Sequence, residues 1–109
     1  MALILSSGGS NAFELVHTET KSVDPAFPGT FTSFNLDAGE YIFSFQYSRV
    51  VTGMTFTITG ATLVESSAGS EVPYMGIYRV TNAGAISVSW SSSAGPGTAS
   101  DFTLNVYTA

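Results

Sequence analysis

Few side chains in this chain of 109 residues are of the types that carry acid–base or nucleophilic chemistry. There is no cysteine, so disulfides, thiol catalysis and thiolate metal sites are excluded. His17 is the only histidine and continues a strand row with Phe13 and Leu15, which is typical of a histidine at a core edge or an interface. A general base would need a partner to orient it, and no Gly-x-Ser-x-Gly motif supplies a nucleophile. The sequence therefore predicts that the chain is not an enzyme.

Carboxylates are the most numerous charged groups, and most of them border turns. Eight acids against three bases give a formal net charge of −5. Asp37 and Glu40 flank Gly39 and are the nearest approach to a calcium site, but calcium needs several carboxylates together. We expect a hairpin entry with solvated acids, and neither a metal nor another cofactor. The acidic balance also argues against a nucleic-acid partner and an anionic membrane, because both require clustered cations.

Aromatic side chains could stack on the apolar faces of sugar rings. The candidates are Trp90, Tyr47, Tyr74, Tyr78 and Tyr107. Trp90 and Tyr47 continue inward-facing rows, which favours core packing for both. Tyr107 falls opposite the row of its strand and is expected to face outward.

Alternation with a period of two dominates the sequence and predicts an all-β fold. Four segments alternate strongly, at 40–49, 54–59, 86–91 and 102–106. Weaker strands are expected at 12–19, 30–36, 61–65 and 74–81, with 1–5 as a further edge strand.

One domain spanning 1–109 is expected, because two domains would each be unusually small. Many short antiparallel strands must pack as two sheets or close into a barrel. A jelly roll of about eight strands suits the strand count and a wide loop over 20–30. An immunoglobulin-like sandwich is the alternative.

The first five residues are apolar but do not form a targeting signal. No basic residue precedes Lys21, and the apolar run ends before Ser6, so a signal peptide is not expected. No stretch approaches the ~20 apolar residues that cross a bilayer. We expect the chain to be made and used, or assembled into something larger, in the cytoplasm.

The low fraction of charged residues indicates that the chain assembles into an oligomer or a larger complex. Charged residues make up 10% of the chain, against about 25% in an ordinary domain, and Ser and Thr occupy the polar strand faces. Uncharged strand edges are a hazard that an obligate oligomer, here a dimer or trimer, would cover. Residues 1–5 could pair within their own sheet or add to the sheet edge of a neighbouring subunit.

Several apolar residues are candidates for such an interface. The strand around 74–78 is apolar on both faces, so it is either central in the fold or covered by a partner. Phe27 and Phe31 belong to a proline-rich loop that a partner could cover. The candidate interface residues are Leu3, Ile4, Leu5, Phe27, Phe31, Tyr74, Met75, Tyr78 and Tyr107.

The run Leu-Asp-Ala-Gly-Glu-Tyr-Ile-Phe-Ser-Phe at 36–45 resembles the entry strand of small jelly rolls in carbohydrate-binding modules, TNF-like trimers and bacteriophage accessory proteins. The ending Gly-Thr-Ala-Ser-Asp-Phe-Thr-Leu-Asn-Val-Tyr at 97–107 has the same look. With its length, its lack of cysteine and its lysine-poor surface, the chain resembles a small bacteriophage virion accessory protein of the capsid decoration, or cement, type.

This resemblance implies a structural role in the virion after assembly in the host cytoplasm. The protein would bind the major capsid protein or another virion protein, bridge neighbouring subunits and stabilise the shell. No family residue maps onto a particular position. The alternative is a carbohydrate-binding or adhesin module of a tail or fibre, with a glycan as partner.

Overall fold

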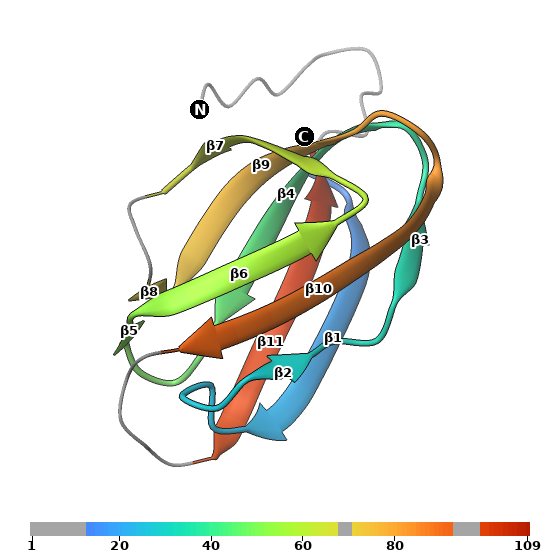
Figure 1. Ribbon diagram of the computed structural model, residues 1–109. Helices are drawn as coiled ribbons and strands as arrows, with labels where there is room; N and C mark the ends of the chain where they lie inside the picture. Colours follow the sequence, from blue (N-terminus) through green and yellow to red (C-terminus); the bar gives the residue numbers. More distant parts are fainter. Residues whose placement is uncertain (1–12, 68–70, 93–98) are drawn as a thin grey trace.

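Two antiparallel β-sheets packed face to face form the protein in a computed structural model, which describes residues 13–67, 71–92 and 99–109 (Figure 1). Within these ranges there is no helix, and hence none that could span a membrane. The strands are β1 (Leu15–Val23), β2 (Gly29–Thr30), β3 (Phe34–Leu36), β4 (Gly39–Gln46), β5 (Val51–Thr52), β6 (Met54–Thr59), β7 (Thr62–Ser66), β8 (Glu71–Val72), β9 (Tyr74–Val80), β10 (Gly84–Ser92) and β11 (Ser100–Thr108).

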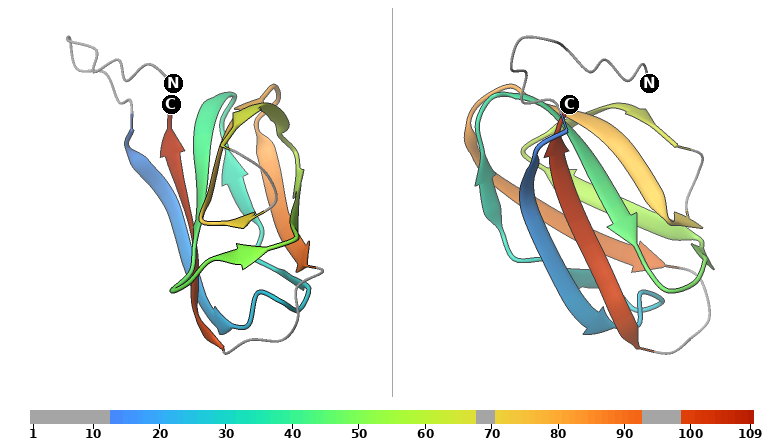
Figure 2. Two further views of the ribbon diagram at one scale, coloured as in Figure 1. Left: turned by 90° about the vertical axis from the view of Figure 1, so that its left-hand side faces the viewer. Right: turned by 180° about the vertical axis from the view of Figure 1, so that it is seen from behind.

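The first sheet has five strands in the order β1-β11-β4-β9-β7. In the second sheet, β10 lies between β6 on one side and the short strands β2 and β3 on the other, while β5 and β8 pair separately. The edge-on view shows β1, β11 and β4 in one layer and β10 and β3 in the other (Figure 2). The predicted antiparallel β-sandwich is confirmed.

The connections between the sheets bear on the two topologies expected for such a sandwich. The chain changes sheet between β1 and β2, between β3 and β4, between β9 and β10, and again between β10 and β11. An immunoglobulin-like sandwich keeps more of its consecutive strands together in one sheet. The strand order therefore favours the jelly roll.

The core consists of the inward-facing rows that alternation predicts. All four strongly alternating segments are strands. Trp90, on β10, is 4% exposed, and its ring lies edge-on to Phe102 of the opposite sheet with centroids 4.9 Å apart. Its indole N–H donates to the Phe27 carbonyl over 2.8 Å, so the inward prediction for Trp90 is confirmed. The buried core residues are Phe31, Leu36, Tyr41, Phe43, Phe45, Met54, Val72, Tyr74, Tyr78, Val80, Ile86, Val88, Trp90, Phe102, Leu104 and Val106.

The first described strand differs from its prediction. Instead of ending near residue 19, β1 extends to Val23, through much of the expected loop. A shift in register between Leu15 and His17 marks a bulge, and Phe13 has a positive φ of 64°. Because the bulge adds a residue, Leu15 and His17 lie on opposite faces instead of in one row. The predicted strand at 1–5 lies outside the described residues.

The segment at 30–36 is a strand interrupted in the middle. Its two pieces, β2 and β3, both pair with β10. Phe31 follows the first piece and is 2% exposed, while its N–H donates to the Val88 carbonyl. This interruption explains why Phe31 and Phe34 do not alternate strictly.

Gly29 provides a test of how tightly the core is packed. A Cβ on Gly29 would lie 2.4 Å from a ring carbon of Trp90, whereas a Cβ on Gly84 would meet nothing within 4 Å. Because Trp90 is anchored by its hydrogen bond, we expect Gly29→Ala to lower the free energy of unfolding by about 1–3 kcal/mol. The matched variant Gly84→Ala should change it by less than about 1 kcal/mol. Urea unfolding of both variants measures the difference, and equal stabilities would contradict this packing.

Candidate functional site

An apolar row crosses the outer face of the five-stranded sheet. Cross-strand partners share a face, and the register pairs Leu15 with Tyr107, Tyr107 with Ile42, and Ile42 with Ile77. We call these four residues the outer apolar row. Leu15 is 49% exposed, Tyr107 and Ile77 are half-buried, and Ile42 is buried. Four neighbouring strands thus present apolar side chains on a face that points away from the core.

Polar rows lie beside the outer apolar row. The Thr18 hydroxyl donates to the Asn105 side-chain oxygen over 2.6 Å, and the hydroxyls of Thr20 and Thr103 lie 2.9 Å apart. Met75 joins this face from β9 and is 47% exposed. An apolar centre with a polar rim is the usual anatomy of a protein-binding surface.

A second apolar feature is the cleft between β6 and β7, which has a volume of about 470 Å³. Phe56 and Ile58 line it from β6, Leu63 from β7, and Tyr74 and Tyr78 from β9. The two tyrosine hydroxyls lie 2.8 Å apart. Burial and this hydrogen bond raise the pKa of Tyr78, so its hydroxyl stays protonated.

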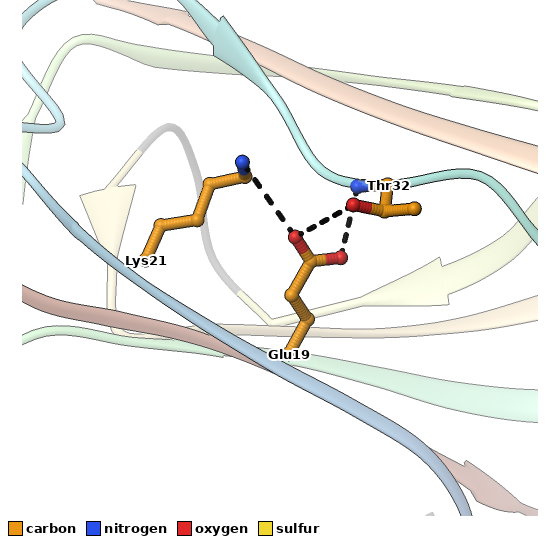
Figure 3. Close-up of polar contacts among 3 residues, drawn as sticks. All are labelled: Glu19, Lys21 and Thr32. Carbon is orange, nitrogen blue, oxygen red and sulfur yellow. Dashed lines mark hydrogen bonds and ion pairs between the residues drawn. The ribbon is translucent and has the colours of Figure 1, made fainter.

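On the opposite side of the sandwich, charged residues of β1 close the gap between the sheets (Figure 3). The Glu19 carboxylate accepts hydrogen bonds from the Thr32 backbone N–H over 2.8 Å and from the Thr32 hydroxyl over 3.2 Å. Lys21 Nζ lies 3.7 Å from the same carboxylate. Thr32 falls between β2 and β3, so Glu19 holds the interrupted strand of the second sheet against the edge of the first.

His17 belongs to the same seam. Its ring stacks on Phe34 with centroids 3.8 Å apart and an angle of 10° between the planes. Its Nε2 is buried and has no hydrogen-bond partner among the described residues. Burial lowers the pKa of His17 below its usual value of 6.5, although the nearby Glu19 carboxylate acts in the opposite direction. A stacked, neutral ring suits the predicted core-edge position better than that of a general base.

In the hairpin that carries Asp37 and Glu40, the Glu40 carboxylate forms an ion pair with Arg79. Arg79 Nη2 lies 2.6 Å from the Glu40 carboxylate, and Arg79 Nε donates to the same oxygen. At Asp37, the backbone carbonyl accepts a hydrogen bond from the Tyr41 hydroxyl. Over the described ranges, no cluster of three or more His, Cys, Asp or Glu side chains could hold a metal ion.

Among the sugar-stacking candidates, Trp90 is buried, and Tyr47 is half-buried against the edge of Phe102. An open cleft of about 320 Å³ lies beside Trp90 and is lined by Lys21, Asp24 and Phe27, among others. Phe27 is the exposed aromatic of this cleft, at 55%.

Three candidate interface residues lie in the core instead of on an exposed surface. Phe31, Tyr74 and Tyr78 are 2%, 7% and 6% exposed. Their own sandwich buries them, because β9 lies inside the five-stranded sheet and Phe31 packs against Trp90 with centroids 4.9 Å apart. The candidates at 3–5 lie outside the described residues.

The remaining three candidates are accessible. Met75 and Tyr107 lie on the outer face of the five-stranded sheet, where Tyr107 points away from the core as expected. Phe27 lies in the loop between β1 and β2, at a different surface. The structure therefore brings Met75 and Tyr107 onto one face and leaves Phe27 apart.

Sequence reasoning missed the centre of the outer apolar row. Alternation places Ile42 on the same side of its strand as Ser44 and Gln46, which are polar, so that side does not read as apolar. The sequence signal that could have revealed this row is an apolar residue, Ile42, on the opposite strand face from the aromatic residues Tyr41 and Phe43. Alternation alone did not show that β11 and β9 flank β4 and align such residues.

No family model, curated protein or solved structure matches the chain.

Protonation of His17 should weaken the fold. Because the pKa of His17 is lowered in the folded protein, the unfolded chain binds the proton more tightly, and stability falls as the pH drops through about 6.5. In His17→Phe, which keeps a ring against Phe34, this contribution should be absent. Urea unfolding at about pH 7.5 and about pH 5.5 should show a larger loss for the native chain than for His17→Phe. An equal loss in both would contradict the assignment.

Proposed function

We propose that the chain is a structural protein of a bacteriophage virion, of the capsid decoration type, which binds the capsid lattice as an oligomer. The observation that supports it best is the outer apolar row, an uninterrupted apolar band across four strands of a sheet face that has no second layer among the described residues. The choice of a capsid as partner follows from the resemblance to small virion jelly rolls.

The chemistry of the outer face fits a protein partner. Leu15 and Met75 are each about half-exposed, and apolar area that binding removes from water contributes roughly 25 cal/mol per Å². The hydrogen-bonded Thr and Asn pairs at the rim already satisfy each other, so a partner can cover them without leaving unpaired polar groups. With a net charge of −5, the chain favours a partner surface that is apolar or basic.

A glycan-binding module is the second candidate, and the cleft beside Phe27 favours it. Phe27 offers an exposed ring, while Lys21 and Asp24 line the same cleft and could hydrogen-bond to sugar hydroxyls. This candidate predicts binding at the loop end of the sandwich instead of on its outer face.

Co-sedimentation with empty capsids of the phage that encodes the chain tests the proposal. The native chain should saturate a fixed number of sites per shell. Met75→Lys places a charge beside the outer apolar row and should weaken binding about tenfold or more, equivalent to ~1.4 kcal/mol. Val50→Lys is the matched control, because Val50 is 61% exposed in the turn before β5.

Equal binding by Met75→Lys and Val50→Lys would contradict the assignment of the outer face. Absence of co-sedimentation by the native chain would contradict the capsid role itself. If Phe27→Ala then abolished binding to a glycan array while leaving the fold intact, the adhesin alternative would replace it.

A further inference from the structure

We infer that β6 is a docking edge for residues 1–5 of a second copy of this chain, whose side chains enter the cleft between β6 and β7. The inference deepens the oligomeric part of the proposed function and rests on it. It concerns a different surface from the outer apolar row, so the two can be tested separately.

Of the four edges that the two packed sheets have in the described residues, three carry features that oppose the addition of another strand. On β1, Glu19 and Lys21 lie on the inward side of the strand and a bulge interrupts its start. The edge formed by β2 and β3 is broken into two short pieces. On β7, the register shifts between Leu63 and Glu65. Inward charges, short strands and bulges are the devices that keep natural sheet edges from pairing.

The fourth edge, β6, has none of these features. It pairs with β10 over its full length from Met54 to Thr59 with no shift in register. No other strand of the described ranges pairs with it. Its exposed side chains are Thr55, Thr57 and Thr59, so no charge protects it. An uncharged, regular edge of this kind is a template for another extended segment.

The cleft beside β6 suits the side chains that such a segment would carry. Phe56, Ile58 and Leu63 contribute apolar side chains to its walls, beside the polar residues Thr57 and Ser66, and Leu63 remains 49% exposed. A strand added to β6 would direct alternate side chains into this cleft. Apolar residues at alternate positions of that strand would pack against Phe56, Ile58 and Leu63.

Residues 1–5 provide such apolar residues. The segment Met-Ala-Leu-Ile-Leu is uncharged and apolar throughout, and its length is close to that of β6. The next residues, Ser-Ser-Gly-Gly-Ser, have the Gly/Ser composition that is typical of linkers. The candidate interface residues Leu3, Ile4 and Leu5 thereby gain a specific place to bind.

The position of Phe13 favours a segment from a second copy over the chain's own. The Phe13 N–H donates to the Thr108 carbonyl, the Ala109 N–H donates to the Glu40 carbonyl, and the register continues from Glu40 through Arg79 to Thr62. Phe13 thus lies at the end of the molecule where β6 turns into β7.

On the most direct path from that end, the chain's own residues 1–5 would run beside β6 in the same direction as β6. Such a pair would be parallel, whereas every strand pair of the described ranges is antiparallel. Parallel pairing is slightly less stable than antiparallel pairing. A segment from a second copy is not tied to Phe13 of the same chain and can pair antiparallel.

Chemical cross-linking tests the inference, because any introduced cysteine is unique in this chain. Ile4→Cys and a size-tagged Thr57→Cys chain are mixed and treated with a short bis-maleimide, which tolerates a small offset in register. In the matched control, the Ile4→Cys chain is mixed with a Thr20→Cys chain, whose cysteine lies on the protected edge β1. The double variant Ile4→Cys/Thr57→Cys reports pairing within one chain. Circular dichroism checks that each variant is folded, and Thr55→Cys replaces Thr57→Cys if that variant is not.

We expect a covalent heterodimer from Ile4→Cys with Thr57→Cys and none with Thr20→Cys. A synthetic peptide of residues 1–6 should compete with its formation. A cross-link confined to monomers of the double variant would overturn the inference in favour of the chain's own segment. Equal cross-linking to both edges, or none to either, would overturn it as well.

The capsid experiment separates failure of this inference from failure of the proposed function. If no heterodimer forms but Met75→Lys still weakens capsid binding, only the docking edge is wrong. If the heterodimer forms but the native chain does not co-sediment with capsids, the docking of residues 1–5 on β6 is supported. The proposed capsid role is then contradicted.

Discussion

Each sheet of a β-sandwich ends in two strands whose outer backbone groups lack a strand partner, and this chain has few charges with which to protect them. Bulges and an interrupted strand, instead of charges, therefore hinder the pairing of most of its sheet edges with further strands. The bulge in β1 and the interruption between β2 and β3 bring Glu19 within hydrogen-bonding distance of Thr32. That contact joins one edge of each sheet along the same side of the molecule. The bulge in β7 affects a third edge and leaves β6 as the regular one.

The same arrangement determines where apolar surface remains. Aromatic rings from both sheets fill the interior, with Phe45 and Phe56 stacked at 4.2 Å and Trp90 held by its bond to the Phe27 carbonyl. Because β4 is central, its outward residue Ile42 lies between Tyr107 and Ile77 and forms the middle of a band on the outer sheet face. The outer apolar row and the β6–β7 cleft are thus separate surfaces, which allows one to bind a partner and the other a second copy.

Alternation predicted the all-β sandwich because period-two patterning depends only on the local pleat. Strand order depends on long-range pairing, so the outer apolar row, which needs β1, β11, β4 and β9 side by side, was not foreseen. The bulge near Leu15 also had no local signal: one extra residue moved His17 to the inner face and Leu15 to the outer. For Tyr74 and Tyr78, apolar character on both faces of the strand marked a position inside the sheet, where their burial follows from their own core.

Amide hydrogen exchange at the β6 edge tests most directly whether a second copy covers it. The measurement follows the backbone amides of β6 and β1 by NMR at increasing protein concentration, in the native chain and in one lacking residues 1–5. Exchange at outward-facing β6 amides should slow as concentration rises in the native chain alone, while β1 amides stay unchanged. If the β6 amides exchange equally fast at every concentration, or slow equally without residues 1–5, this use of the β6 edge is contradicted.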